Sequence, residues 1–263
     1  MATNKLLLFD GLGIVRRCYE ANLAPDSVDK AQSAAGVALQ SMIRGLREHR
    51  PSHALVIFDH GGPTWRHDLY PLYKANRKPM SPYLAAELFL MKERMADLGW
   101  ALMAHPGEEA DDTIKGVAQA AVEVGEEVVV LANDKDLVRL VDYGVQVYNH
   151  YHRCWQDHDW CMNRFGVKPG LLTDFLALMG DSVDNIPGVD RIGEKTAARL
   201  LNEYGQLTAV LDAAAAGDIK GVIGKRLVEQ RERALISLEL ASLRSTFSSL
   251  DLWMDELEAP SLR

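Results

Sequence analysis

Three apolar, strand-like runs of this sequence end in an acid: KLLLFD at Asp10, HALVIFD at Asp59 and EVVVLAND at Asp134. Because the carboxyl ends of parallel strands meet at one edge of a sheet, we expect these side chains to gather there. A single acid after a strand is most often the N-cap of the next helix, which is the competing structural interpretation.

Other acids belong to the same expected edge. They precede or begin a helical pattern, or follow the third run: Glu109, Asp111, Asp112 and Asp136. So many converging carboxylates would repel one another unless cations lay among them. Oxygen ligands favour hard divalent ions, with Mg²⁺ or Mn²⁺ the best fit. Two such ions would suit phosphodiester hydrolysis, one activating water and one stabilising the leaving oxygen.

A later segment, GDSVDNIPGVDRIGEKTA, supplies two further acids, Asp181 and Asp184. Its glycine-rich turn feeds a helix N-terminus, where backbone N–H groups face an anion, and Lys195 adds positive charge. A helix–turn–helix of this kind holds a DNA phosphate without reading bases. An ordinary pair of helices is the competing interpretation.

A basic segment, GPTWRHDLYPLYKANRKPM, occupies residues 62–80. It combines four cations and three aromatic residues with Asp68 as its one acid: Arg66, Lys74, Arg77 and Lys78 with Trp65, Tyr70 and Tyr73. Cations that follow phosphates and rings that stack on bases are typical of single-strand binding. A solvated basic loop is the competing interpretation. In a helix, residues 74 and 77 would share one face.

The elements that would position these groups alternate along the chain. We expect strands at residues 5–10, 53–59, 100–104, 127–134 and 145–149. Helices with apolar residues three or four apart are expected between them, at 34–49, 84–98 and 111–124. This alternation predicts an α/β fold with a doubly wound parallel sheet. Beyond about residue 165 only helices are expected, at 171–180, 194–204 and 224–242.

Composition bounds the class of protein. The chain has 263 residues, 48% hydrophobic and 25% charged, enough for one large domain or two small ones. Three cysteines and no long apolar run indicate a cytoplasmic protein without a membrane span. The net charge of −8 argues against a nucleic-acid partner. That objection disappears if nine of the acids bind metal, because the net charge of all other residues is then +1.

These motifs, in this order, resemble the 5′ nucleases, which include the flap endonucleases and the 5′–3′ exonuclease domain of bacterial DNA polymerase I. FDG, the basic segment, EADD, NDKDL and GDSVDNIPGVDRIGEKTA extend from about residue 6 to 200. The length and the IVRR after the first acid are similar to stand-alone bacterial members with no fused polymerase. The resemblance implies a PIN-like, mostly parallel sheet over 1–165, an arch at about 60–98, and a helical region over 166–263 with a helix–three-turn–helix motif.

The resemblance also implies roles for single residues. The first metal site would comprise Asp10, Asp59, Glu109, Asp111 and Asp112. The second would comprise Asp134, Asp136, Asp181 and Asp184. The base of the arch, acting on the scissile phosphate, would comprise Tyr73, Lys74 and Arg77. DNA contacts would come from Arg16, Arg66, Arg191, Ile192, Gly193, Glu194, Lys195 and Thr196. In the stand-alone members a potassium ion is held by backbone carbonyls, which here would be those of Leu178, Met179, Pro187, Val189 and Ile192.

Two departures from the family pattern stand out. Asp190 and Arg191 occupy the place of a small pair such as Pro-Gly, so Arg191 could add a phosphate contact and Asp190 could weaken one. Asn133 replaces a usual Gly, Ser or Thr.

The sequence therefore predicts a Mg²⁺- or Mn²⁺-dependent nuclease that cuts branched or 5′-flap DNA near the single-strand/duplex junction and trims 5′ ends. We expect a monomer that acts in DNA replication and repair. The alternatives are a catalytically weak binder of branched DNA and a PIN-like ribonuclease. We do not expect a zinc site in the 150–161 cluster, because the spacing of its residues matches no standard zinc module. These residues are His150, His152, Cys154, His158 and Cys161. GLG at 11–13 lacks the third glycine of a dinucleotide fingerprint.

Overall fold

The computed structural model describes residues 4–247 and 254–261. The chain forms two compact units, each assembled from segments that are distant in sequence. Unit 1 comprises Met1–Gly62, Pro79–Gln156 and Arg244–Arg263, and unit 2 comprises Pro63–Lys78 and Asp157–Leu243. Among the described residues, no helix has the combination of length and apolar character needed to cross a bilayer.

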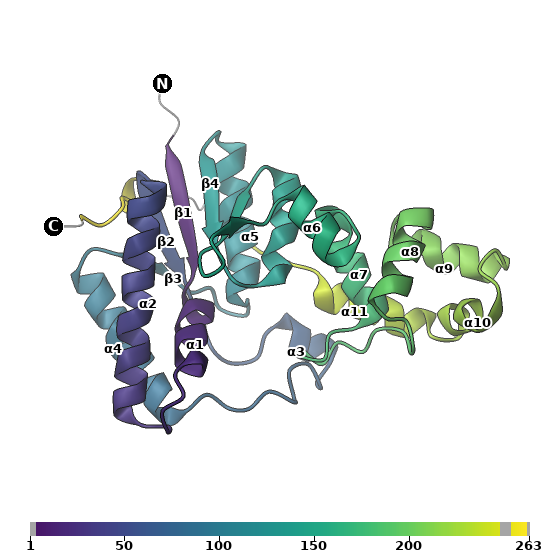
Figure 1. Ribbon diagram of the computed structural model, residues 1–263, viewed down its shortest axis with the longest axis horizontal. Coiled ribbons are helices and arrows are strands. Elements are labelled where there is room, and N and C mark those ends of the chain that lie inside the picture. The colour runs from purple at the N-terminus through teal and green to yellow at the C-terminus, as the bar shows by residue number, and fades with distance from the viewer. Residues whose placement is uncertain (1–3, 248–253, 262–263) are drawn as a thin grey trace. The chain divides into compact units, whose positions relative to one another are not determined.

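A six-stranded sheet forms the centre of unit 1 (Figure 1). Its strands are β1 (Lys5–Asp10), β2 (His53–Ile57), β3 (Ala101–Met103), β4 (Glu127–Leu131), β5 (Gln146–Asn149) and β6 (Cys154–Trp155). They are ordered β3-β2-β1-β4-β5-β6, and β6 alone is antiparallel within this described sheet. The expected α/β fold with a mostly parallel sheet is confirmed. β6 was not predicted, because two residues are too few to show a period.

Two predicted strand ends were wrong. β2 ends at Ile57 and β4 at Leu131, so Asp59 and Asp134 lie in the loops that follow rather than on the last strand residue. Both carboxylates accept a backbone N–H there. Asp59 binds the N–H of Ala110, from a distant part of the chain, whereas Asp134 binds the N–H of Asp136 in its own loop. Asp10, by contrast, does end β1.

The strands at the centre of the sheet are apolar on both faces, as expected for parallel strands covered by helices. Leu7 and Phe9 of β1 pack into a buried cluster with α1 (Gly11–Ala21), α2 (Val28–His49) and α4 (Pro82–Asp97). Alternate residues such as Leu8 face the opposite side, where α5 (Ala110–Glu123) covers the sheet. The sheet is thereby held rigidly between helices, and its carboxyl-end loops are fixed in place.

The helices of unit 1 begin where side chains can cap them. α2 starts six residues before the predicted position because the Ser27 hydroxyl accepts the Lys30 N–H at 3.2 Å. α4 begins at Pro82 after its predicted cap, Ser81. α1 was not predicted, because its two glycines weaken the helical pattern. A 3₁₀ segment, η1 (Lys135–Tyr143), follows β4, and another, η4, covers Met254–Glu256.

Unit 2 is helical. It contains α3 (Trp65–Leu69), α6 (His158–Phe165), the 3₁₀ turn η2 (Pro169–Leu171), α7 (Leu172–Met179), α8 (Glu194–Tyr204), α9 (Leu207–Ala216), α10 (Gly221–Glu229) and α11 (Arg231–Ala241). The prediction of α8 is confirmed. The prediction of one helix over 224–242 was wrong, because the chain bends out of helical geometry at Gln230, with φ −113° and ψ 24°. α7 and α11 pack together as its central pair (Figure 1).

Candidate functional site

In unit 1, the strand order reverses beside β1. The chain runs from β1 to β2 and β3 on one side, then crosses back to β4, β5 and β6 on the other side of β1. Such a switch point opens a crevice at the carboxyl ends of the strands, where ligands bind in open α/β sheets. Asp10 and Asp134 follow the two strands that flank this point. Both acids therefore stand where the fold places a ligand site.

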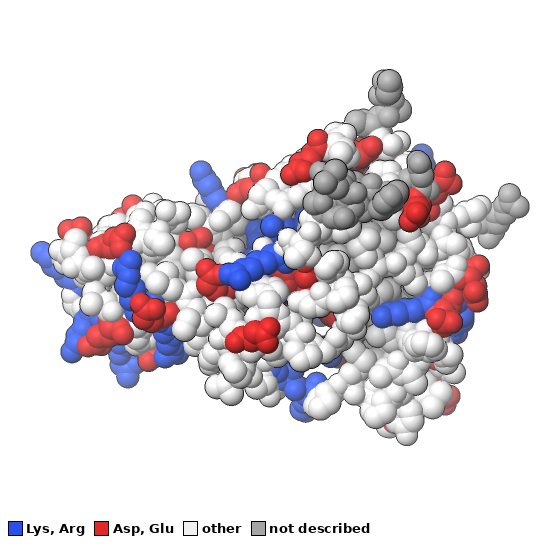
Figure 2. Space-filling model, turned by 180° about the vertical axis from the view of Figure 1, so that it is seen from behind, with Lys and Arg blue, Asp and Glu red and all other residues white. Residues whose placement is uncertain are grey.

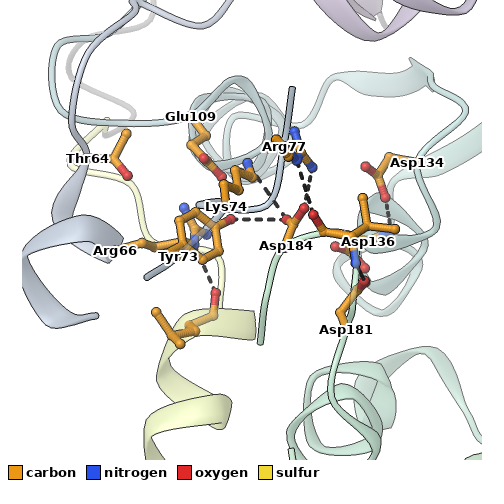
Figure 3. Close-up of polar contacts among 12 residues, drawn as sticks. Thr64, Arg66, Tyr73, Lys74, Arg77, Glu109, Asp134, Asp136, Asp181 and Asp184 are labelled. Atoms are coloured by element: carbon orange, nitrogen blue, oxygen red, sulfur yellow. Dashed lines mark hydrogen bonds and ion pairs between the residues drawn. The ribbon is translucent and has the colours of Figure 1, made fainter. Parts of the chain in front are cut away.

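Asp10 and Asp134 also cap the elements that follow them. Asp10 Oδ1 accepts the Gly13 N–H at 2.9 Å, and Asp134 Oδ1 accepts the Asp136 N–H at 2.9 Å (Figure 3). The N-cap interpretation is thus correct for one oxygen of each, and it leaves the second oxygen of each carboxylate to other partners. Gly13 is required for this approach, since a Cβ there would lie 1.8 Å from Asp10 Oδ2.

The N-terminus of α5 carries three more of the predicted acids. Glu109 is its N-cap residue, and Asp111 and Asp112 lie in its first turn, where the helix dipole stabilises negative charge. Asp59 Oδ1 accepts the Ala110 N–H at 2.9 Å, which ties the loop after β2 to this helix end.

Asp112 has a structural role that the sequence did not predict. Its side chain is fully buried, and both of its oxygens accept backbone N–H groups. Oδ2 binds the Glu109 N–H at 3.2 Å, and Oδ1 binds the Arg244 N–H at 2.8 Å. Asp112 therefore fixes the start of α5 and joins it to the segment that returns to unit 1 at residue 244.

Asp111 reveals how closely these acids approach one another. Burial is the largest cause that raises its pKa well above the usual value, and the charges of Asp134, Asp10, Asp136 and Glu109 raise it further. Five of the predicted ligands therefore lie close enough for their charges to act on one carboxyl group. They come from the end of β1, the start of α5 and the loop after β4. Their ionised forms destabilise one another until a cation lies among them.

Arg139 compensates part of this charge and was missed by the sequence analysis. It is buried, and its guanidinium lies 3.4 Å from Asp136 Oδ1, an atom that is itself buried without a hydrogen-bond partner. Its Nε donates to the Asp136 carbonyl at 2.6 Å. The signal that could have revealed it is the i, i+3 spacing of acid and arginine in DLVR.

Lys92 is a second cation missed by the sequence analysis. Its Nζ lies 4.3 Å from the centre of the Phe58 ring. Burial lowers its pKa, while the nearby Asp59 carboxylate opposes that shift. The apolar stripe of α4 gave no sign of a functional neighbour, because the lysine lies on its less buried side.

Within unit 2, the predicted arch residues converge on one carboxylate, that of Asp184 (Figure 3). Tyr73 Oη donates to Asp184 Oδ2 at 3.1 Å, and Lys74 Nζ lies 3.7 Å from the same oxygen. The Arg77 guanidinium binds Asp184 Oδ1. Two predicted catalytic cations and a predicted metal ligand therefore already form one charged cluster.

The backbone around this cluster is not helical, so the expected shared helix face of Lys74 and Arg77 was wrong. Lys74 has a left-handed φ of 54°, and its N–H donates to the Asp184 carbonyl at 2.9 Å. Asn185 Nδ2 in turn donates to the Leu72 carbonyl at 2.6 Å. Successive turns in this segment are hydrogen-bonded to the GDSVDN loop, and they bring Lys74 and Arg77 together instead. Asp181, 8% exposed, stabilises that loop by accepting the Val183 N–H at 2.8 Å.

Arg66 does not occupy the position that a DNA contact requires. It is 2% exposed, and its Nε and Nη2 donate to the carbonyls of Leu240 and Ser242 at 2.9 and 2.7 Å. The guanidinium therefore caps the C-terminal end of α11, as cations commonly do. In sequence, a buried capping arginine and an exposed phosphate ligand look the same.

The expected phosphate-binding turn lies before α8, whose N-cap residue is Gly193. Ile192 is buried beneath it, whereas the other predicted contacts of this turn are exposed or partly exposed: Arg191, Gly193, Glu194, Lys195 and Thr196. Arg16, the remaining predicted contact, is partly buried on α1 in unit 1. Charges of both signs are interleaved over the helical end of unit 2 on the face drawn in Figure 2, so a uniform basic surface is not what this face offers.

Among residues 4–247 and 254–261, no three His, Cys, Asp or Glu side chains form a ready-made metal cage. Mg²⁺ keeps several waters and is held by one or two carboxylates, so it does not require a closed set.

Comparison with known proteins identifies the family. Residues 5–166 match the model of the 5′–3′ exonuclease N-terminal resolvase-like domain, and residues 167–262 match that of the 5′–3′ exonuclease C-terminal SAM fold. The chain belongs to the 5′–3′ exonuclease family.

Relatives in this family differ in overall length. The flap endonuclease Xni of Tolumonas auensis is 35% identical over 91% of this chain and 92% of its own length. DNA polymerase I of Pseudomonas aeruginosa is 37% identical over 98% of this chain, which spans 29% of that protein. A structure of the bacteriophage T5 flap endonuclease with DNA and metal ions has the same fold, with a TM-score of 0.74, 19% identity, and coverage of 91% of this chain and 89% of that one.

The first prediction concerns the repulsion around Asp111. A carboxyl whose pKa is raised by folding leaves stability unaffected at low pH and lowers it as pH rises. We therefore expect Asp111→Asn to raise the unfolding midpoint of the metal-free protein at neutral pH, by about 2–4 °C per kcal/mol relieved. Below about pH 4 the gain should vanish.

Calorimetry in EDTA across this pH range measures the effect. Asp97→Asn, at an exposed position near the end of α4, is the matched control and should change the midpoint little. A destabilised Asp111→Asn variant at neutral pH, or a gain that grows toward acid pH, would contradict the prediction.

The second prediction distinguishes a structural Arg66 from a DNA-binding one. Arg66→Met leaves the carbonyls at the end of α11 without their donor, so we expect a loss of about 2–3 kcal/mol in the free energy of unfolding. Lys78→Met, at an exposed position in the same basic segment, should leave stability unchanged. Denaturant titration of both variants measures this, and an Arg66→Met variant of native stability would show that the cap is dispensable.

Proposed function

We propose that this protein is a structure-specific 5′ nuclease that hydrolyses DNA phosphodiesters at junctions between single strands and duplex. The observation that carries the proposal is the group of five acids around Asp111 at the switch point of the sheet. A carboxylate cluster in that place is costly to a protein that has no cation to bind there. The names of relatives such as the flap endonuclease Xni support the same activity.

The donor set fits a hard divalent ion. All five groups are carboxylates, one has a raised pKa, and Asp136 Oδ1 is buried without a hydrogen bond. We propose Mg²⁺ as the resident ion, with Mn²⁺ as a substitute, held by one or two of these carboxylates together with water molecules. When bound, two such ions would lower the pKa of a water molecule and neutralise charge on the leaving oxygen.

In this mechanism the remaining residues of unit 1 hold the carboxylates in position. Asp59 and Asp112 anchor the N-terminus of α5 through backbone N–H groups, so the acids there cannot turn away from the edge. Arg139 forms an ion pair with Asp136 and so limits the directions in which that carboxylate can turn. The direct ligand roles expected for Glu109, Asp59, Asp112 and Asp136 remain predictions.

In unit 2, Lys74 and Arg77 would bind and orient the scissile phosphate. They already share the Asp184 carboxylate, and a phosphate offers them the same charge with more acceptor oxygens. Tyr73, which is buried and donates to Asp184, would hold that carboxylate in place. The ligand roles of Asp181 and Asp184 toward a second ion remain predictions, and Asp184 would be available to an ion once phosphate has taken over its cations.

The turn before α8 would hold duplex DNA through exposed backbone N–H groups and Lys195. The resemblance adds a potassium ion on five carbonyls, but the chain fits that ion poorly at Pro187. The Pro187 carbonyl accepts the Arg233 guanidinium at 3.0 Å, which already places a positive charge at this turn. We therefore derive no step from a potassium ion.

A non-catalytic binder of branched DNA is less well supported, since such a protein has no use for the repelling carboxylates of unit 1. A PIN-like ribonuclease would need the sheet and its acids but not the turn before α8. The balance of exonuclease and endonuclease activity, the monomeric state and the cytoplasmic location remain predictions.

The experiment that tests the function compares two labelled substrates, a 5′-flap DNA and a single-stranded RNA of equal length, in Mg²⁺ and in EDTA. We expect Mg²⁺-dependent cleavage of the flap near its junction and little cleavage of the RNA. Cleavage of RNA alone would favour the ribonuclease, and tight flap binding without cleavage in either Mg²⁺ or Mn²⁺ would favour the binder.

The third prediction tests Lys74. If it stabilises charge that develops on the scissile phosphate, Lys74→Met should lower the single-turnover rate by about 10²–10³-fold, as is typical for removal of one transition-state donor. DNA affinity should fall only slightly, because the interaction is made mainly in the transition state.

Rapid-quench measurements at saturating enzyme give the rate, and Lys78→Met controls for the loss of one positive charge in the same segment. A Lys74→Met rate within a few fold of wild type would mean that Lys74 acts only as part of a basic surface.

A further inference from the structure

One face of the helices α10 and α11 is bound to the backbone of the turn at 187–190. Four polar side chains on this face recur at intervals of four, three and four residues: Arg226, Gln230, Arg233 and Ser237. Arg233 and Ser237 lie four apart on α11 and share one face of that helix, while Arg226 on α10 and Gln230 at the bend between the helices reach the same turn. Each of the four makes at least one hydrogen bond to this turn. We call these four residues the brace.

The two C-terminal members of the brace hold the first half of the turn. Ser237 is fully buried, and its Oγ accepts the Gly188 N–H at 3.0 Å while donating to the Arg233 carbonyl at 2.8 Å. Arg233 Nη2 donates to the Pro187 carbonyl at 3.0 Å. Gly188 lies against the backbone of Gly180, where a Cβ would come within 2.3 Å of its nitrogen, so this half of the turn is tightly fitted.

Gln230, Arg226 and Arg233 all bind Asp190, through its backbone or its carboxylate. Gln230 accepts the Asp190 N–H at 3.0 Å and donates to Asp190 Oδ2 at 3.2 Å. Arg226 donates to the Asp190 carbonyl at 3.1 Å. Arg233 Nη1 lies 3.0 Å from Asp190 Oδ1, so one guanidinium joins the carboxylate to the Pro187 carbonyl.

The brace accounts for the unusual pair at 190–191. Arg191 adopts φ 62°, a conformation that costs a non-glycine residue about 1–2 kcal/mol. Asp190 brings a negative charge to a turn expected to bind phosphate. The hydrogen bonds from α10 and α11 offset the first cost, and Arg233 neutralises the second.

We propose that the brace replaces a monovalent cation, so that the turn binds duplex DNA without dependence on potassium. The Pro187 carbonyl, one of the five expected to coordinate that ion, is occupied by a fixed guanidinium, whose charge opposes a second cation beside it. The carbonyls of Leu178 and Val189 each accept one N–H, from Val189 at 2.8 Å and from Ile192 at 3.1 Å, and keep a second lone pair, so the Pro187 contact carries the proposal. This proposal rests on the proposed DNA binding of the turn.

The test measures affinity for a 5′-flap DNA by fluorescence anisotropy, with the full chain in EDTA, in KCl and in LiCl. Ionic strength must be equal, since counterion release alone changes affinity. Wild type should bind equally in the two salts. Arg233→Met should bind about tenfold more weakly in LiCl, as expected for loss of one charged hydrogen bond, and should recover part of that loss in KCl.

Arg231→Met is the matched control, because Arg231 lies on the same helix and pairs with Asp212 rather than with the turn. It should change affinity equally in both salts. Wild-type affinity that is about tenfold higher in KCl than in LiCl would overturn the proposal. So would an Arg233→Met variant that behaves as Arg231→Met does.

Hydrogen exchange of residues 186–192 without DNA provides a readout independent of the proposed function. Exchange should be the same in both salts for wild type, faster in LiCl for Arg233→Met, and slowed again by KCl. Arg233→Gln, which also removes the positive charge, should show the same pattern, and this variant covers the case in which Arg233→Met does not fold. If exchange follows this pattern but the flap DNA is not bound, the brace stands and the proposed function fails. Salt-dependent wild-type exchange with normal flap cleavage would reject the brace alone.

Discussion

Repulsion among carboxylates at the carboxyl-end edge of the sheet is the constraint around which unit 1 is built. The pKa of Asp111 is raised by burial and by four neighbouring acids, so the folded chain holds negative charges together at a cost. Every element near the edge limits that cost without removing it. The N-terminus of α5 supplies its dipole, Asp10 and Asp134 direct one oxygen each to backbone N–H groups, and Arg139 pairs with Asp136. In the proposed function a divalent ion completes the compensation, which would explain why the acids are tolerated.

The same rule applies within unit 2, where side-chain cations balance Asp184 and Asp190. Asp184 is shared by Lys74 and Arg77, groups that a phosphate would also attract. Asp190 is held by Arg233. The two pairings differ in consequence. The first is open to exchange, because a phosphate offers Lys74 and Arg77 the same charge with more acceptor oxygens. The second is locked by three further side chains and serves to shape the turn.

Local patterns predicted the elements with strong periodicity or clear caps. β1 and α8 have the predicted bounds, and Ser81 caps α4 as its position before Pro82 indicated. Errors arose where tertiary contacts decide. α1 was missed because Gly11 and Gly13 are poor helix formers, yet Gly13 is what allows Asp10 to cap that helix. The break at Gln230 was missed because residues 229–233, EQRER, contain no glycine or proline that would mark a helix end.

The candidate site shows the same division. Its acids could be found from sequence, because their placement depends only on where strands end and helices begin. The separate role of each side chain could not be predicted, because it depends on partners that are distant in the sequence. Asp112 accepts an N–H from residue 244, and Arg66 caps a helix that ends more than 170 residues later.

The account depends most directly on a cation relieving the repulsion around Asp111. Isothermal titration of the metal-free protein with Mg²⁺, in two buffers of different ionisation enthalpy, measures both the affinity and the protons released. At about pH 6 to 7, above the usual range for carboxyls, the account predicts saturable binding with release of protons, because the ion displaces protons held by a carboxyl of raised pKa. The release should fall in Asp111→Asn. Absence of saturable binding by both Mg²⁺ and Mn²⁺, or binding that releases as many protons in the variant as in wild type, would contradict it.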